Sequence, residues 1–296
     1  MWIPITLISA FFWAAVNVLD SSLVKNYDKH PMMLMWSQSL FSIPALIIIA
    51  LTCNIQTDWK TWLMIGGAIA FLGDLLFFYV LDRIDTSISN AAWAILALLL
   101  SLGGFLLFQE SWTTMQTVGA VLILGGAGFL SFWHRHISLV RTLLLLTALA
   151  ALYAPTYLLK KAAVDAGQGL LPVFFWLVLS REILATTLPW FSTKGRGRIR
   201  SLVSRADIPF YVISGIVIVC FFLGEFLGGA AYQVGPISLV AVVGNIQPFI
   251  VILLAWVIAR FIPQHAAREL LTMHSLQTKV VGFTAVFIGL ALLSLS

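Results

Sequence analysis

Residues 91–108 read AAWAILALLLSLGGFLLF, a run in which Ser101 is the one polar side chain. Apolar residues cover every face of this run, whether it is followed with the 3.6-residue period of a helix or the two-residue period of a strand. A helix that crosses a hydrocarbon core of about 30 Å needs roughly 20 such residues, whereas barrel strands alternate between apolar and polar side chains. The run therefore predicts a membrane-spanning helix and argues against a β-barrel.

The composition extends this conclusion to the whole chain. Of the 296 residues, 60% are hydrophobic and only 10% are charged, and the mean hydropathy is +1.00. Soluble domains carry about a quarter charged residues, so a soluble enzyme, a secreted disulfide scaffold and a disordered chain are excluded. The two cysteines, Cys53 and Cys220, have no redox or metal-binding spacing. The net charge of +5 is interpreted as a signal of membrane orientation, and we expect no nucleic-acid partner.

Runs of the required length recur along the chain, separated by charged or turn residues. The ten predicted spans are residues 3–22, 33–52, 61–81, 87–108, 114–133, 139–160, 170–191, 208–231, 237–261 and 277–295. Pro31, Pro172, Pro209 and Pro236 lie at or just before the start of four spans, where a missing amide donor costs least. The predicted fold is all-α, a polytopic membrane protein with ten transmembrane helices.

Loop charges predict the orientation, because cytoplasmic loops are rich in Lys and Arg. The loops after the odd-numbered spans hold thirteen such residues: Lys25, Lys29, Arg83, Arg135, Arg141, Lys194, Arg196, Arg198, Arg200, Arg205, Arg260, Arg268 and Lys279. The other loops hold only Lys60, Lys160 and Lys161. Both termini are thus predicted on the non-cytoplasmic side. The cluster between residues 194 and 205 is interpreted as a topology anchor, with anionic lipid or a partner as the alternative.

The two halves of the chain are related by an internal repeat. An offset of about 150 aligns Leu72-Gly73-Asp74 with Leu223-Gly224-Glu225, and one of about 140 aligns Trp13 with Tyr153. Five spans per copy is an odd number, so the second copy enters the membrane from the opposite side. The sequence therefore predicts two inverted five-helix repeats, residues 1–136 and 137–296, an arrangement typical of secondary transporters.

Two local patterns accompany this repeat. One combines Ser89-Asn90-Ala91-Ala92, an apolar helix, Gln109-Glu110 and Met115-Gln116-Thr117-Val118-Gly119, and the other is Ser180-Arg181-Glu182-Ile183-Leu184-Ala185. Over essentially its whole length the chain resembles the drug/metabolite transporter superfamily, and within it the ten-helix EamA type. The resemblance implies a carrier in a cell inner (plasma) membrane, although a eukaryotic internal membrane fits too. The chain departs from the family in lacking a proline near Ala97-Leu98, and family members commonly place their termini in the cytoplasm.

Charged residues inside predicted spans are functional candidates, because each costs roughly 2.5 to 3.5 kcal/mol on insertion scales. Asp74, Glu225 and Arg181 meet this criterion. Asp74 and Glu225 correspond under the repeat, so either could bind a substrate amine or carry a proton. Arg181 could clamp a substrate carboxylate, which together with a carboxylate would suit a zwitterion. In the alternative interpretation, Arg181 pairs with Asp74, Glu225 or Glu182 and only fixes helix packing.

Four uncharged polar residues complete the candidate substrate-binding or proton-coupling site: Asn17, Tyr157, Asn245 and Gln247. The two amides precede Pro248, which frees backbone carbonyls within a helix, and such a kink often borders a cavity. Interhelical hydrogen bonds, worth about 0.6 kcal/mol on average, are the alternative role. Glu110, at a helix end, is predicted to make a cap or loop contact.

The predicted function is transport without enzymatic activity, cofactor or metal. The substrate is expected to be a small polar metabolite such as an amino acid, exported by alternating access, with the lipid bilayer and protons as the other partners. No ATP-binding Gly-x-x-x-x-Gly-Lys-Ser/Thr pattern is present. A membrane channel and a membrane-embedded enzyme acting on lipid-linked substrates are the alternative functions. The sequence leaves open the substrate, the flux direction, the coupling ion and the choice between monomer and homodimer.

Overall fold

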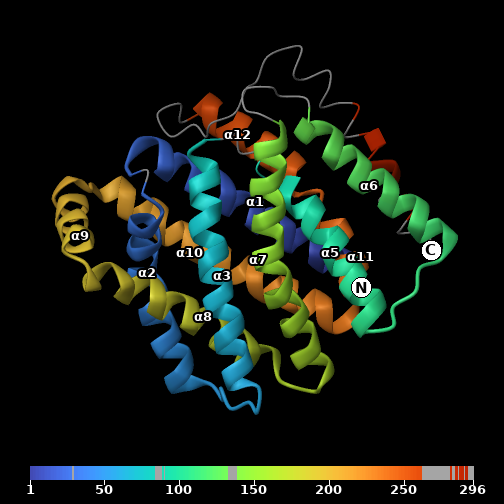
Figure 1. Cartoon of the computed structure of the whole chain (residues 1–296), viewed down its shortest axis with the longest axis horizontal. Coiled ribbons are helices and arrows are strands. Elements are labelled where there is room, and N and C mark those ends of the chain that lie inside the picture. Colours follow the sequence, from blue (N-terminus) through green and yellow to red (C-terminus); the bar gives the residue numbers. More distant parts are fainter. Residues whose placement is uncertain are drawn as a thin grey trace.

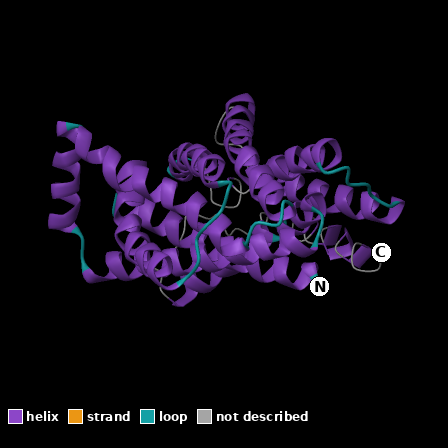
Figure 2. Ribbon diagram, turned by 90° about the horizontal axis from the view of Figure 1, so that it is seen from below, coloured by secondary structure: helices purple, strands orange, loops and turns teal. Residues whose placement is uncertain are grey.

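The structure is a computed structural model, and it describes residues 1–28, 30–83, 89, 91–132, 139–261, 281, 284–285, 287–289 and 291–292. Throughout these residues the regular structure is helical, which confirms the all-α prediction for the described part of the chain (Figure 2). The helices are α1 (Trp2–Asn26), α2 (Pro31–Thr52), α3 (Lys60–Leu81), α5 (Ala91–Leu107), α6 (Thr114–Phe132), α7 (Leu139–Asp165), α8 (Leu170–Thr187), the 3-10 helix η1 (Leu188–Phe191), α9 (Thr193–Arg205), α10 (Ile208–Val234), α11 (Ile237–Gly244) and α12 (Gln247–Phe261). The predicted span 277–295 lies largely outside the described residues, as do Lys29, Arg135, Arg268 and Lys279 of the orientation count.

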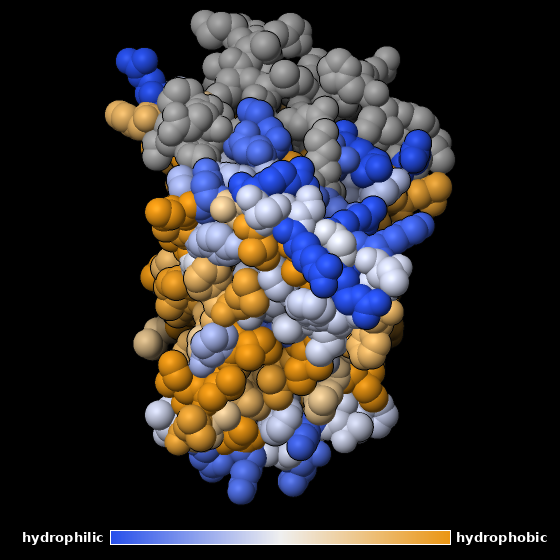
Figure 3. Space-filling model, turned by 90° about the vertical axis from the view of Figure 1, so that its left-hand side faces the viewer, coloured by the Kyte–Doolittle hydropathy of each residue, from blue (hydrophilic) through white to orange (hydrophobic). Residues whose placement is uncertain are grey.

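Six described segments are long and apolar enough to cross a membrane: Trp2–Asn26, Pro31–Thr52, Lys60–Leu81, Leu170–Phe191, Ile208–Val234 and Ile237–Phe261. Large apolar side chains are exposed along them, including Leu51 at 81% and Ile208 at 78%. On the face drawn in Figure 3, apolar side chains gather in a broad zone with hydrophilic side chains above and below it. A soluble protein does not expose so much contiguous apolar surface. The chain is therefore a multi-pass membrane protein.

Two features of the helices differ from the prediction in ways that matter for the site. Helix α7 continues to Asp165, so Lys160 and Lys161 lie within a helix and not in a loop. The predicted span 237–261 is found with these bounds, but within it the helix is broken into α11 and α12 at Asn245 and Ile246. Pro248 has no N–H to donate to the carbonyl of Gly244, so the helix cannot run on without interruption.

The predicted loop between the seventh and eighth spans is largely helical. Helix α8 ends at Thr187 and η1 follows, with Pro189 in its first turn. The basic stretch then forms α9, which begins where the Ser192 side chain accepts a hydrogen bond from the Gly195 N–H at 2.9 Å. Similarly, Asp207 caps α10 through the Phe210 N–H at 3.0 Å. Helix α9 lies at the edge of the molecule, at the left of Figure 1.

Helices from the first part of the sequence pack mainly on helices from the second (Figure 1). Helix α1 lies along α10, α3 lies against both α8 and α7, and α5 lies against α7 and α11. The close approach of α1 and α10 depends on Gly224 and Gly228, the small-residue spacing that permits tight helix contacts. A side chain at Gly224 would meet Trp13, and Ser9 donates its hydroxyl hydrogen to the Gly224 carbonyl at 2.7 Å.

Candidate functional site

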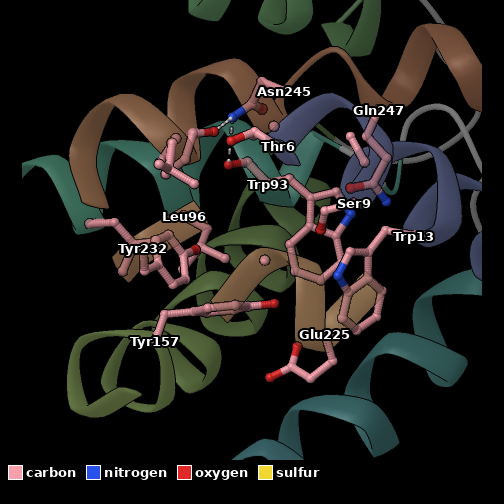
Figure 4. Close-up of a pocket in the computed structure, with 17 residues that line it drawn as sticks. Thr6, Ser9, Trp13, Trp93, Leu96, Tyr157, Glu225, Tyr232, Asn245 and Gln247 are labelled. Atoms are coloured by element: carbon pink, nitrogen blue, oxygen red, sulfur yellow. Dashed lines mark hydrogen bonds between the residues drawn. The ribbon is translucent and has the colours of Figure 1, made fainter. Parts of the chain in front are cut away.

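A cavity lies between α1, α5, α7, α10 and the break between α11 and α12 (Figure 4). Its volume is about 90 Å³. The polar and aromatic residues of its wall are Thr6, Ser9, Trp13, Trp93, Tyr157, Glu225, Tyr232, Asn245 and Gln247. Of the seven predicted site residues, Tyr157, Glu225, Asn245 and Gln247 therefore share this cavity. It is lined from both halves of the sequence.

The break between α11 and α12 brings two amide side chains to the cavity. Asn245 Nδ2 donates to the Ala241 carbonyl at 2.8 Å and to the Trp93 carbonyl at 3.2 Å, which ties α11 to α5. The Asn245 and Ile246 N–H groups bond to the carbonyls three residues earlier, so the last turn of α11 is tight. Gln247 opens α12 and is 7% exposed. Because Pro248 interrupts the helix here, polar groups are present at a depth where a continuous helix would present only apolar side chains.

Glu225 in α10 forms an ion pair with Lys160 in α7. Lys160 is 2% exposed, and its ammonium group lies 4.9 Å from the centre of the Tyr157 ring. Inside a membrane an unpaired charge is costly, and this pair neutralises both groups. The sequence analysis missed Lys160 because it placed the residue in a loop.

Arg181 in α8 forms a second ion pair, with Asp74 in α3. Asp74 also accepts a hydrogen bond from the Tyr153 hydroxyl, and Arg181 contacts Glu182 at 3.2 Å. The guanidinium carbon lies 4.2 Å from the centre of the Phe221 ring. Arg181 thus has protein partners in this conformation, as the alternative interpretation of the sequence expected. Its pairing with Asp74 joins the two halves of the chain.

A further carboxyl group, Asp20 in α1, lies beside this second pair. It is 4% exposed and accepts a hydrogen bond from Gln38 Nε2 at 2.6 Å. Asp20, Asp74 and Arg181 line a cavity of about 20 Å³ together with the predicted residue Asn17. Asn17 is therefore placed with the Arg181 group and not in the cavity that holds Asn245 and Gln247. Asp20 was not among the predicted site residues, although it lies inside the predicted span 3–22, where its charge could have identified it.

The two ion pairs are neighbours. Asp74, Arg181 and Glu225 all line one small cavity of about 40 Å³. Tyr153 and Tyr157 lie between the pairs, with ring centres 6.5 Å apart. The carboxylates Asp74 and Glu225 thus face a common space.

Glu110 connects the loop after α5 to the start of α11. Its carboxylate accepts hydrogen bonds from the Ile237 N–H at 2.7 Å and the Ser238 N–H at 3.1 Å, and also from the Ser238 hydroxyl. Gln109, with φ 54, places the chain in the left-handed region just before it. A carboxylate at a helix N-terminus satisfies amide donors that have no partner within the helix. Glu110 is a cap, as predicted from its place at a helix end.

Comparison with known proteins identifies the first half of the chain. Residues 1–132 match the model of the EamA-like transporter family. This part, which is less than half of the chain, is similar to the EamA-like transporter family, within the drug/metabolite transporter superfamily. Members of this family are transporters, so the match indicates a membrane transporter of the drug/metabolite type.

The fold of the whole chain has a solved counterpart. A crystal structure, described only as that of a protein, matches with a TM-score of 0.66 and 15% sequence identity over 99% of this chain and 96% of the other. At this identity the match shows a shared fold. No curated protein matches the sequence.

Breaking the Lys160–Glu225 pair should destabilise the protein strongly. Lys160→Met leaves the Glu225 carboxylate buried without a partner, which costs about 3 to 5 kcal/mol. The double variant Lys160→Met/Glu225→Gln should recover most of the lost thermal stability in detergent. Asp165→Asn is the control, because it removes the carboxylate that pairs with Lys161 and is 42% exposed, where pairs contribute about 0 to 1 kcal/mol. Equal stability losses in the single and double variants would contradict a pair that is held by charge.

Proposed function

We propose that the protein is a secondary transporter that exports a small polar metabolite, the class that includes amino acids and related compounds, by alternating access. The observation that carries this proposal is the central cavity, whose wall combines residues of α1 and α5 with residues of α7, α10 and the α11–α12 break. Such a cavity at the junction of two halves opens to either side of the membrane when the halves rock.

We further propose that the halves, residues 1–136 and 137–296, form inverted five-helix repeats. Under the repeat α1, α2, α3 and α5 correspond to α7, α8, α10 and the α11–α12 segment. The packing is reciprocal, as a two-fold axis requires: α1 contacts α10 and α7 contacts α3, while α3 contacts α8 and α10 contacts α2. The contact of α5 with α7 has its counterpart in the contacts of α11 and α12 with α1. This reciprocity supports the repeat independently of the sequence offsets.

Proton coupling through Asp74 or Glu225 is part of the proposal. Each carboxylate is paired with a cation, Arg181 or Lys160, and both line one small cavity. Protonation of a carboxylate would release its cation partner, so proton binding and helix packing are physically linked. Such a link is what a proton-driven conformational change needs.

Counterflow in proteoliposomes tests the carrier mechanism. The purified protein should exchange labelled small polar metabolites in a saturable manner and be stimulated by the same solute inside the vesicle. Flux that rises linearly with concentration and shows no counterflow would favour a channel instead, and release of a chemically altered product would favour an enzyme. The pH dependence of exchange should flatten in Asp74→Asn or Glu225→Gln and persist in Asp165→Asn. Wild-type pH dependence in both carboxylate variants would exclude coupling through these groups.

We also propose that the protein lies in a cell inner (plasma) membrane with both termini outside. The basic helix α9 would then lie on the cytoplasmic side, in agreement with the positive-inside rule.

Cys53 provides a direct test of this orientation. It is exposed just after α2, in a loop that this orientation places outside, whereas Cys220 lies partly buried within α10. A membrane-impermeant thiol reagent should label intact cells, and the label should disappear in Cys53→Ser. Labelling that requires permeabilised cells would reverse the orientation.

A further inference from the structure

Three buried polar atoms of the cavity wall have no hydrogen-bond partner within the described structure. They are Trp93 Nε1, Asn245 Oδ1 and Gln247 Nε2. An unsatisfied buried polar group costs about 1 to 3 kcal/mol, so native proteins keep few of them without a reason. All three belong to residues that line one cavity, so a ligand bound there could complete them.

The hydrogen-bonding roles of the Trp93 and Asn245 atoms are fixed. Trp93 Nε1 is only a donor. The Asn245 side chain cannot turn over, because a flip would place its oxygen against the Trp93 and Ala241 carbonyls that Nδ2 now satisfies. Asn245 Oδ1 is therefore an acceptor. Gln247 Nε2, with the amide oriented as it is in this structure, is a donor. A ligand that satisfies all three atoms must carry one N–H donor and two hydrogen-bond acceptors.

The charge of the wall selects a neutral ligand. Glu225 is the one acidic or basic residue among those that line the cavity, and Lys160 already neutralises it. A ligand carboxylate or phosphate would find no unpaired cation in the wall. A ligand that is charged would therefore lose its hydration without compensation.

The shape and size of the cavity favour a single flat ring. Trp13, Trp93, Tyr157 and Tyr232 supply aromatic surfaces in the wall (Figure 4). Aromatic side chains stack on flat heterocycles, which gives about 1 to 3 kcal/mol for each base in nucleic-acid complexes. An apolar cavity of about 150 Å³ holds benzene, so the 90 Å³ of this cavity leaves room for no more than one small ring.

We infer that the transported substrate is a neutral single-ring heterocyclic amide, in which an N–H donor lies next to carbonyl or ring-nitrogen acceptors. This chemistry is shared by pyrimidine nucleobases and by pyridine carboxamides. The inference rests on the proposed function and narrows its substrate class. It replaces the zwitterion that the sequence suggested, because Arg181 and Glu225 are both paired within the protein.

The test measures binding of uracil and nicotinamide to the detergent-purified protein by thermal shift, with a mixture of amino acids and with benzoate as comparisons. Uracil or nicotinamide should raise the melting temperature in a saturable manner, and benzoate should not. A response to uracil alone would show that the site prefers ligands whose amide is part of the ring. A response to nicotinamide alone would show that it prefers ligands whose amide is a substituent on the ring. Failure of both compounds would overturn the inference.

Two variants connect binding to the unpaired atoms. Trp93→Phe and Gln247→Met each remove one donor that has no protein partner, so the ligand-free protein should be as stable as wild type or more stable. Ligand affinity should fall about fivefold to tenfold in each variant, the effect of one lost hydrogen bond. Ser214→Ala is the matched control, because Ser214 Oγ is also buried without a partner but lies away from this cavity. Unchanged affinity in both cavity variants would contradict the assigned site.

Counterflow with the same compounds separates the two proposals. Exchange of uracil or nicotinamide supports both. Exchange of amino acids alone overturns the heterocycle and leaves the transporter in place. If wild-type proteoliposomes exchange none of these solutes, the heterocycle is excluded as a transported substrate, and any binding in detergent then bears on the site alone.

Discussion

Charge pairing inside an apolar environment is the constraint on which the rest of this structure depends. Arg181 pairs with Asp74 and Lys160 pairs with Glu225, in helices that are otherwise surrounded by apolar side chains. Neither charge of a pair is stable there without the other, so the helices that carry them have little freedom in register. The pairs fix α3 to α8 and α7 to α10, and the small cavity between them joins both.

Further polar contacts lie where the regular helical structure is interrupted, at the two ends of α11. Pro248 ends the hydrogen-bond ladder of α11, and Asn245 uses the interruption to bond the Trp93 carbonyl of α5. Glu110 holds the opposite end of α11 by capping its first amides. Both ends of this short helix thus contact residues of the first half. The cavity wall is thus built where the two halves hold each other.

Much of the fold could be predicted from the sequence, because membrane spans are marked by length and hydropathy alone. The ends of the helices could not be predicted in this way, and Lys160 is an example. Hydropathy ends a span at the first lysines, but a lysine that finds a carboxylate partner on another helix remains inside. The partner Glu225 is 65 residues away in sequence, and no local pattern pairs them. The break within the predicted span 237–261 could be predicted only in part. Pro248 indicated a kink, but the capping of α11 by Glu110 is a tertiary contact that the local sequence does not reveal.

The sequence predicted which charged residues belong to the candidate site, but not which of them pair with one another. The sequence singled out Asp74, Glu225 and Arg181 because charges are rare in membrane helices, and this reasoning depends on residue type alone. Which charges pair depends on how α3, α7, α8 and α10 cross, which is a property of packing. Asp20 was passed over although it lay within a predicted span, and its hydrogen bond from Gln38 explains how a carboxyl group remains there.

The central claim is that one cavity between the halves is reached from both sides of the membrane in turn. Its most direct test is the accessibility of a single cysteine at Ala241, which lines the cavity, in a Cys53→Ser/Cys220→Ser background. A small membrane-impermeant thiol reagent should label Ala241→Cys when applied from either side of sealed vesicles, and transported substrate should slow the reaction from both sides. Labelling from one side only, with and without substrate, would contradict alternating access through this cavity.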